Sequence, residues 1–192
     1  MGVNLRWYLA NALYREARAA GSAPDRVVFL SLHADARHPA LRGAMVYVPG
    51  ASRCGGTHGF ANATYRTYRE VRAAPLVTFP RKDLVRSEAV SRKLAESVLK
   101  ELRAAGLPVQ TIKPVRDRVL RGDASWVPAV LRGNAIPAKL LIEVLNLSNA
   151  QDAALLGAAE ERQRIAEALG AALIRHFGDR PVDPGTRAAK RE

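Results

Sequence analysis

The chain has 192 residues, of which 48% are hydrophobic, so it is long enough to bury one substantial core and too short for two large ones. It contains no uninterrupted apolar run of about 18 residues, which excludes an ordinary transmembrane helix, and its charged N-terminal segment is unlike a secretory signal peptide. A net charge of +12 favours polyanionic partners such as nucleic acid, anionic lipid or an acidic cell-wall polymer.

The first predicted element is a helix. Leu5, Leu9, Leu13 and Ala17 recur at four-residue spacing, which is typical of an amphipathic helix with one apolar face. Glycine is the commonest residue just beyond a helix, so we expect this helix to end near Gly21.

Two apolar runs then predict buried strands, at Val27–Leu32 and at Ala44–Val48. The stretch Gly50–Lys82 is first rich in glycine and then basic, with tyrosines among the arginines, and it predicts a surface insertion at about residues 50–82. After the insertion, apolar residues at four-residue spacing predict a long helix that Gly106 and Pro108 close.

The C-terminal half predicts further strands and one more helix. The strands are expected at Val109–Ile112, Trp126–Leu131 and Ala138–Leu145. Ser148 and Gln151 have the spacing of a capping box, which predicts the start of the last helix. The core face of that helix is expected to consist of Ile165, Leu169, Leu173 and Phe177.

This alternation of strands and helices predicts an α/β fold, with a mainly parallel sheet and helices on both faces. We expect one domain, residues 1–178, which carries the insertion at about 50–82. Residues 179–192 contain proline, glycine and charge without periodicity, and they predict a disordered tail.

Candidate chemistry lies at His33 and Glu143, which stand at or near the ends of the two most apolar strands. Ligands of open α/β sheets bind at strand ends, a neutral imidazole binds zinc well, and a glutamate beside a metal-bound water can act as general base. Cys54 is the single cysteine, which excludes a disulfide within the chain and a cysteine-cluster metal site. Two other interpretations remain open, a structural role for His33 and an ion pair of Glu143 with Lys139 or a nearby arginine.

Several segments, in order, resemble the zinc-dependent N-acetylmuramoyl-L-alanine amidases related to the bacterial cell-division amidases. The similar segments are RWYLAN at residues 6–11, VVFLSLHADA at 27–36, RGAMVYVPG at 42–50, RSEAVSRKLAE at 86–96 and VLRGNAIPAKLLIEVLNLSNAQDAALL at 130–156. The resemblance implies a three-layer amidase fold and hydrolysis of the amide bond between N-acetylmuramic acid and L-alanine in peptidoglycan. It implies Zn²⁺ as cofactor, His33 as a metal ligand and Glu143 as the catalytic glutamate, whereas Asp35 is expected to be a turn or supporting residue. It gives no assignment of substrate-binding residues.

The chain departs from this family near its start. The family opens with an Asp-x-Gly-His-Gly-Gly-type turn and a following helix, which supply a histidine and a glutamate as zinc ligands, and neither motif occurs in this sequence. We therefore expect an N-terminally incomplete amidase domain or a domain that has lost the site. His38 and His58 are expected to be surface histidines, and His176 lies near the end of the last helix, where a cation is favoured.

The resemblance also implies a partner and a place of action. Peptidoglycan is the expected partner, the location is periplasmic or extracellular, and the insertion is a candidate contact for a regulatory protein. The alternatives are a non-catalytic peptidoglycan-binding or regulatory protein on the same scaffold and, less favoured, a basic nucleic-acid-binding protein. Only the charge supports the last of these, because 6% of the residues are aromatic and no nucleic-acid-binding motif is evident.

Overall fold

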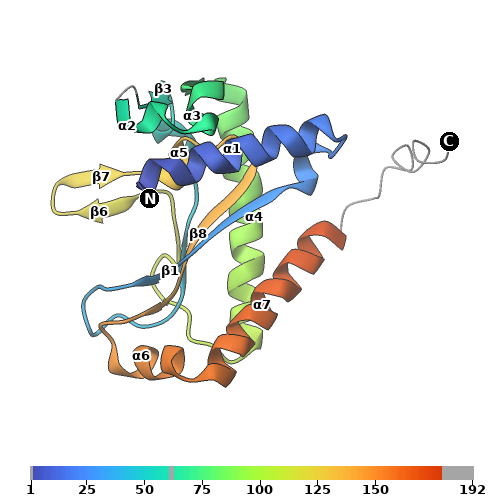
Figure 1. Ribbon diagram of the computed structural model, residues 1–192. Coiled ribbons are helices and arrows are strands. Elements are labelled where there is room, and N and C mark those ends of the chain that lie inside the picture. The colour runs from blue at the N-terminus through green and yellow to red at the C-terminus, as the bar shows by residue number, and fades with distance from the viewer. Residues whose placement is uncertain (1, 61–62, 179–192) are drawn as a thin grey trace.

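The computed structural model describes residues 2–60 and 63–178, which form helices and strands along the chain (Figure 1). The expected tail at 179–192 lies outside these residues. The helices are α1 (Val3–Ala19), α2 (Ala63–Arg66), α3 (Arg69–Ala73), α4 (Arg81–Ala104), α5 (Ala129–Arg132), α6 (Ala150–Gly157) and α7 (Ala159–Gly178). The strands are β1 (Val28–Asp35), β2 (Met45–Tyr47), β3 (Thr57–Gly59), β4 (Leu76–Thr78), β5 (Val115–Arg116), β6 (Val119–Arg121), β7 (Ala124–Trp126) and β8 (Ala138–Asn146).

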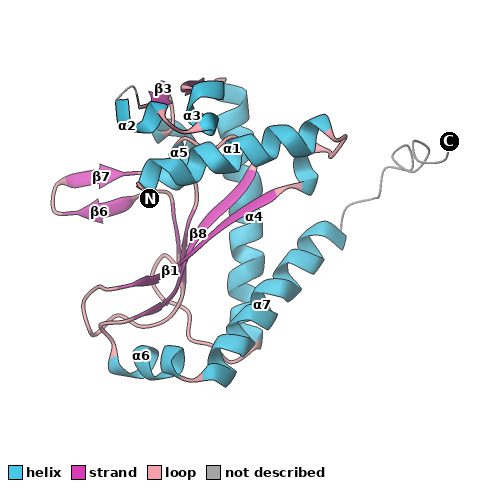
Figure 2. Cartoon of the chain, in the orientation of Figure 1, coloured by secondary structure: helices cyan, strands magenta, loops and turns pink. Residues whose placement is uncertain are grey.

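The central sheet has the strand order β1-β8-β2-β5. β1 runs parallel to β8 and β5 runs parallel to β2, whereas β2 is antiparallel to β8. β1 is therefore an edge strand, and β8 lies inside the sheet (Figure 2). β3 and β4 form one separate antiparallel pair, and β6 and β7 form another.

The main core lies between this sheet and the two longest helices. Leu140 and Ile142 of β8 are fully buried against Leu94 and Leu102 of α4 and Leu169 of α7. Side chains of a strand alternate between its faces, so the intervening residues of β8 point the other way. There Leu141 packs with the apolar residues of α5, and α1 lies on α5. The predicted α/β fold with helices on both faces is confirmed.

α1 forms where the periodicity predicts it, but its buried face is different. Leu9 and Leu13 are 44% and 55% exposed, whereas Trp7 and Tyr8 are buried with their rings stacked. The aromatic rings bury more apolar area than the leucines, so they determine which face of α1 turns inward. Of the four-residue leucine pattern, Leu5 is buried as expected, whereas Leu9 and Leu13 are wrong as core residues.

Asn11 ties α1 to the segment that leads into β8. It is buried, its side-chain amide donates to the carbonyl of Gly133 (2.9 Å), and its side-chain oxygen accepts from the N–H of Ala135 (2.7 Å). Asn11→Ala leaves both backbone groups without these partners, so it is expected to lower the free energy of unfolding by about 2 kcal/mol. Urea denaturation measures the loss, with exposed Leu13→Ala as the control on the same helix, expected within about 0.5 kcal/mol of the parent. Equal losses in the two variants would contradict the assignment.

The strands expected at Trp126–Leu131 and Val109–Ile112 do not form at those positions. The first strand ends at Trp126, and Pro128 is the N-cap of α5 rather than a residue inside a strand, since proline lacks the N–H that a strand would use. Between Val109 and Ile112 only a single bridge forms, from Val109 to Ala44. β5 follows Lys113, which adopts a positive φ of 47°, so the chain turns before it joins the sheet.

The segment expected to form one last helix forms two helices, α6 and α7, and the residue that caps the first of them differs from the one expected. Asn149, rather than Ser148, caps α6, and its side-chain oxygen accepts from the N–H groups of Gln151 and Asp152. Ala158 is extended and separates α6 from α7. Of the residues expected on the core face of α7, Ile165 and Leu169 are buried.

The segment at 50–82 is anchored on α1. Val71 of α3 is fully buried with Leu5 and the two α1 aromatics. The hydroxyl of Tyr8 donates to the carbonyl of Pro75 (2.7 Å) and accepts from the N–H of Phe60 (3.0 Å). The part of the insertion that the structure describes is thus packed onto the domain, and its role as a regulatory contact stays a prediction.

Candidate functional site

The strand register brings the two residues singled out in the sequence together. His33 of β1 is paired with Glu143 of β8, and Met45 of β2 is paired with Glu143 from the other side. Neighbouring strands lie about 4.8 Å apart, and paired residues of parallel strands share a face. His33 and Glu143 therefore stand side by side, both half-buried, on the face that Leu141 shares.

One oxygen of the Glu143 carboxylate has no hydrogen-bonding partner among the described residues. This atom, Oε2, is buried. Burial, and then the negative charge of Asp35, raise the pKa of Glu143 to about 7, against an opposing effect from Arg37. Near neutral pH the group is divided between carboxylate and carboxylic acid, so it can both accept and donate a proton.

The ion pair of Glu143 with Lys139, which the sequence left open, does not form. The Lys139 ammonium instead donates to the backbone carbonyl of Asn134 at 2.5 Å. Lys139 and Glu143 lie on the same face of β8, but four residues apart. Their Cα atoms are therefore about 13 Å apart along the strand, which is too far for a direct ion pair.

His33 is held in its neutral form. Burial, and then the positive charge of Arg6 on α1, lower the pKa of the imidazole below its ordinary value of 6.5. Its Nε2 atom lies 3.0 Å from the hydroxyl oxygen of Ser31, two residues earlier on the same face. A neutral imidazole retains a lone pair, which is the form that binds a metal or accepts a proton.

Residues after His33 complete the polar surroundings. The pairing of β1 with β8 shifts between His33 and Asp35, and Asp35 forms an ion pair with Arg37 at 3.3 Å. Arg37 also donates to the carbonyl of Leu120 in the β6–β7 hairpin (3.4 Å). Burial raises the pKa of Tyr47 on β2, and charges from Arg37 and Asp35 reach it too. Arg37 and Tyr47 were missed as site residues, since an arginine in a loop and a tyrosine in an apolar run carry no distinctive signal.

The described residues do not bring a full zinc ligand set together. Residues 2–60 and 63–178 contain no group of three or more His, Cys, Asp or Glu side chains placed to hold a metal. His38 accepts from the N–H of Ala40 at an exposed turn, and His58 on β3 lies 3.0 Å from the carbonyl oxygen of Cys54. Catalytic zinc takes three protein ligands, so His33 fits as one donor but these residues do not make a complete site.

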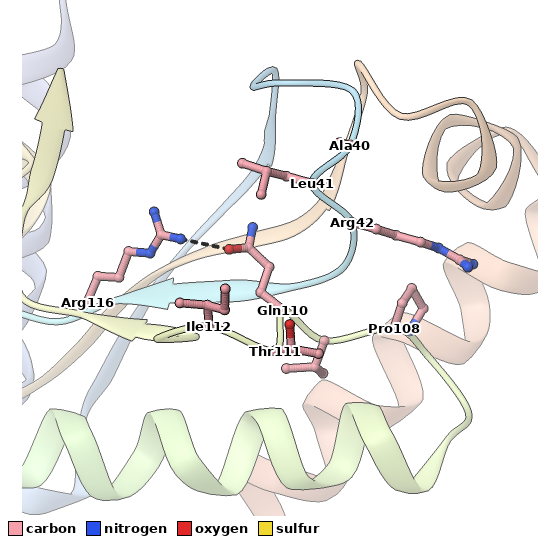
Figure 3. A pocket seen from close by; sticks show the side chains of 9 residues that line it. Ala40, Leu41, Arg42, Pro108, Gln110, Thr111, Ile112 and Arg116 are labelled. Atoms are coloured by element: carbon pink, nitrogen blue, oxygen red, sulfur yellow. Dashed lines mark hydrogen bonds between the residues drawn. The ribbon is translucent and has the colours of Figure 1, made fainter. Parts of the chain in front are cut away.

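A cavity of about 410 Å³ lies apart from this pair, between the loop at Ala40–Arg42 and the segment at Pro108–Arg116 (Figure 3). Arg116 donates to the side-chain oxygen of Gln110 at 2.8 Å, whereas Arg42 extends away from both of them. Neither His33 nor Glu143 lines this cavity. Its lining therefore does not complete the site.

Comparison with known proteins covers nearly the whole chain. The family model described as N-acetylmuramoyl-L-alanine amidase matches residues 11–175. No sequence match is found among curated proteins.

Solved amidase structures share the fold. The chain is similar to the N-acetylmuramyl-L-alanine amidase Ami1 from Mycobacterium smegmatis, with 20% identity, a TM-score of 0.55 and coverage of 89% of this chain and 61% of that chain. It is also similar to an N-acetylmuramoyl-L-alanine amidase from Clostridium difficile 630, with 13% identity, a TM-score of 0.54 and coverage of 94% and 68%. The chain thus spans about 61% of the length of the mycobacterial amidase. Because the family model matches most of its residues, the chain belongs to the N-acetylmuramoyl-L-alanine amidase family.

Proposed function

We propose that this chain acts in hydrolysis of the amide bond between N-acetylmuramic acid and L-alanine in peptidoglycan, with Glu143 as the proton-transfer group. Family membership supports the reaction. The observation that carries the residue assignment is the buried, unpartnered Oε2 atom of Glu143 beside His33. A structural carboxylate at such a position would be expected to have a hydrogen-bonding or cationic partner.

Glu143 can serve both halves of the reaction. As a carboxylate it accepts a proton from the attacking water, whose oxygen bonds to the lactyl carbonyl carbon. As a carboxylic acid it returns that proton to the nitrogen of L-alanine when the carbon–nitrogen bond breaks. A pKa of about 7 suits this exchange at neutral pH, because neither protonation state is strongly disfavoured.

Zinc is the cofactor that the resemblance implies, and when bound it would polarise the amide carbonyl and the attacking water. His33 is the described residue best suited to hold it, being a neutral imidazole beside Glu143. One imidazole does not make a three-ligand site, so the proposed proton transfers are assigned to Glu143 alone and not to a metal held by these residues.

The charge of the chain suits a cell-wall substrate. The net charge of +12 favours association with the carboxylates of peptidoglycan, and we propose a periplasmic or extracellular site of action. No helix in the part of the chain that the structure describes is long and apolar enough to cross a membrane.

The test is release of peptide from purified peptidoglycan, with and without added zinc. Glu143→Gln keeps the size of the side chain and removes its proton transfer, so the rate is expected to fall by about 10²- to 10⁴-fold. Glu96→Gln on the exposed side of α4 is the matched control and should retain the parent rate.

A second candidate function is supported by the incomplete ligand set. A wall-binding protein on the amidase scaffold would bind peptidoglycan and release no peptide under either zinc condition. Pull-down of peptidoglycan by the parent chain and by Glu143→Gln alike, without peptide release, would support this function and contradict the proposed hydrolysis.

A further inference from the structure

A second polar feature lies at the other end of β8. A cavity of about 380 Å³ is bounded by α1, the segment around β4, the start of α4 and the segment before β8. The lining includes Phe79, Asp83, Arg86, Ser87 and Lys139. None of these belongs to the His33 and Glu143 site.

Lys139 is the unusual member of this lining. Lys139 is only 4% exposed. A lysine is almost never buried to this extent without a charged partner. The Lys139 ammonium donates to the carbonyl of Asn134 and lies 5.7 Å from the ring centroid of Phe79. No carboxylate oxygen within residues 2–60 and 63–178 lies at ion-pair distance from it.

The charge of Lys139 persists at neutral pH without compensation from its neighbours. Burial lowers the pKa of the ammonium to about 8, so most of it is still protonated at pH 7. Cys54, the other titratable group that acts on it, remains a neutral thiol because burial raises its pKa. An ammonium has three N–H donors, and one of them reaches Asn134.

The remaining lining specifies what kind of anion would fit. Arg86 and Asp83 are exposed and of opposite sign, so with Lys139 the lining carries one excess positive charge. The apolar part includes Leu84, Ala135, three prolines and Phe79, and the ring of Phe79 offers a flat surface. A singly charged head on a flat apolar body would match both properties.

We propose that this cavity binds a small aromatic monocarboxylate, with the carboxylate on the Lys139 ammonium and the ring against Phe79. Such binding supplies the buried ammonium with a negatively charged acceptor, which the residues that the structure describes do not provide. The assignment rests on the cavity and on the contacts of Lys139, and it is independent of peptide release at Glu143.

Titration of the full chain with benzoate, followed by ¹H–¹⁵N NMR, tests the proposal. Shifts are expected at Phe79, Ser87 and Lys139, whereas benzamide, which has the same ring but no charge, should bind at least about tenfold more weakly. Absence of benzoate shifts, shifts confined to other parts of the chain, or equal binding of benzamide would overturn it.

Variants separate the buried charge from the general basicity of the chain. Lys139→Met keeps the length and apolar body of the side chain and is expected to weaken benzoate binding at least about tenfold. Lys82→Met removes the same charge from an exposed position on α4 outside the cavity lining and should bind benzoate as the parent does. Equal weakening in both variants would indicate non-specific attraction and contradict the proposed site.

Discussion

Replacing Asp152 with alanine is expected to lower the free energy of unfolding by about 3–5 kcal/mol, because it leaves two buried backbone N–H groups without their acceptor, at about 1–3 kcal/mol each, and also removes an ion pair. Asp152 is fully buried at the start of α6. One of its carboxylate oxygens accepts from the guanidinium of Arg42 (3.0 Å), and the other accepts from the N–H groups of Gly43 (2.7 Å) and Asn146 (3.0 Å). A single carboxylate thus joins the segment before β2, the end of β8 and α6, and alanine leaves the two buried backbone N–H groups without this acceptor.

Urea denaturation at neutral pH measures this loss. Glu160→Ala, which removes an exposed carboxylate from the first turn of α7, is the matched control and is expected to change the stability by no more than about 0.5 kcal/mol. Asp152→Asn keeps one acceptor oxygen and should fall between the two. A loss in Asp152→Ala no larger than that in Glu160→Ala would show that the buried carboxylate does not hold these elements together.

Glu143→Gln is expected to make the protein more stable at pH 8, by about 1–3 kcal/mol, and to leave its stability unchanged at pH 4. The folded-state pKa of Glu143 is raised from 4.5 to about 7, so the native state holds a proton that the unfolded state releases. Stability is therefore lost as the pH rises from about 4.5 to about 7, and the cost is fully present above pH 7. Glutamine carries no charge at any of these pH values and removes the cost.

Denaturation of the parent and the variant from pH 4 to pH 8 checks the direction. Glu88→Gln is the opposing control: although burial alone would raise the pKa of Glu88, the N–H of Ala51 and the paired Arg92 hold it below the ordinary value. Its charge stabilises the fold above pH 4.5, so Glu88→Gln should be less stable at pH 8. A Glu143→Gln variant that also loses stability at pH 8 would show that Glu143 has a stabilising partner.

The sequence indicated both members of the candidate pair because each lies near the end of a long apolar strand, but it did not predict the register that places them side by side. β1 and β8 are the longest strands, and each has its polar residue near the end, so parallel pairing placed His33 opposite Glu143. The shorter strands were harder to predict. A two-residue strand such as β5 depends on the turn at Lys113 and on pairing with β2. The spacing of apolar residues in the sequence predicts neither of these contacts.

Other parts of the site depended on tertiary contacts. Arg37 reaches the site because Asn146 accepts from its backbone N–H, and the hairpin carbonyl of Leu120 accepts from its side chain. Both partners lie more than 80 positions away along the chain. Local periodicity carries no information on such distant contacts, which also explains why Leu9 and Leu13 were misplaced in the core.

The position of β1 at the sheet edge affects how copies of this protein can meet. Toward β8 its backbone is paired, but on its other side no strand of residues 2–60 and 63–178 lies against it. Such an edge is a template for an extended segment of another molecule, and Leu32, 58% exposed, adds apolar surface there. The irregularity in the pairing of β1 with β8 places the extra residue on β8, between Glu143 and Asn146, so β1 itself stays extended to Asp35. An extended segment of another molecule paired along this edge would lie next to the same strand that carries His33, so self-association would bring a second chain close to the candidate site.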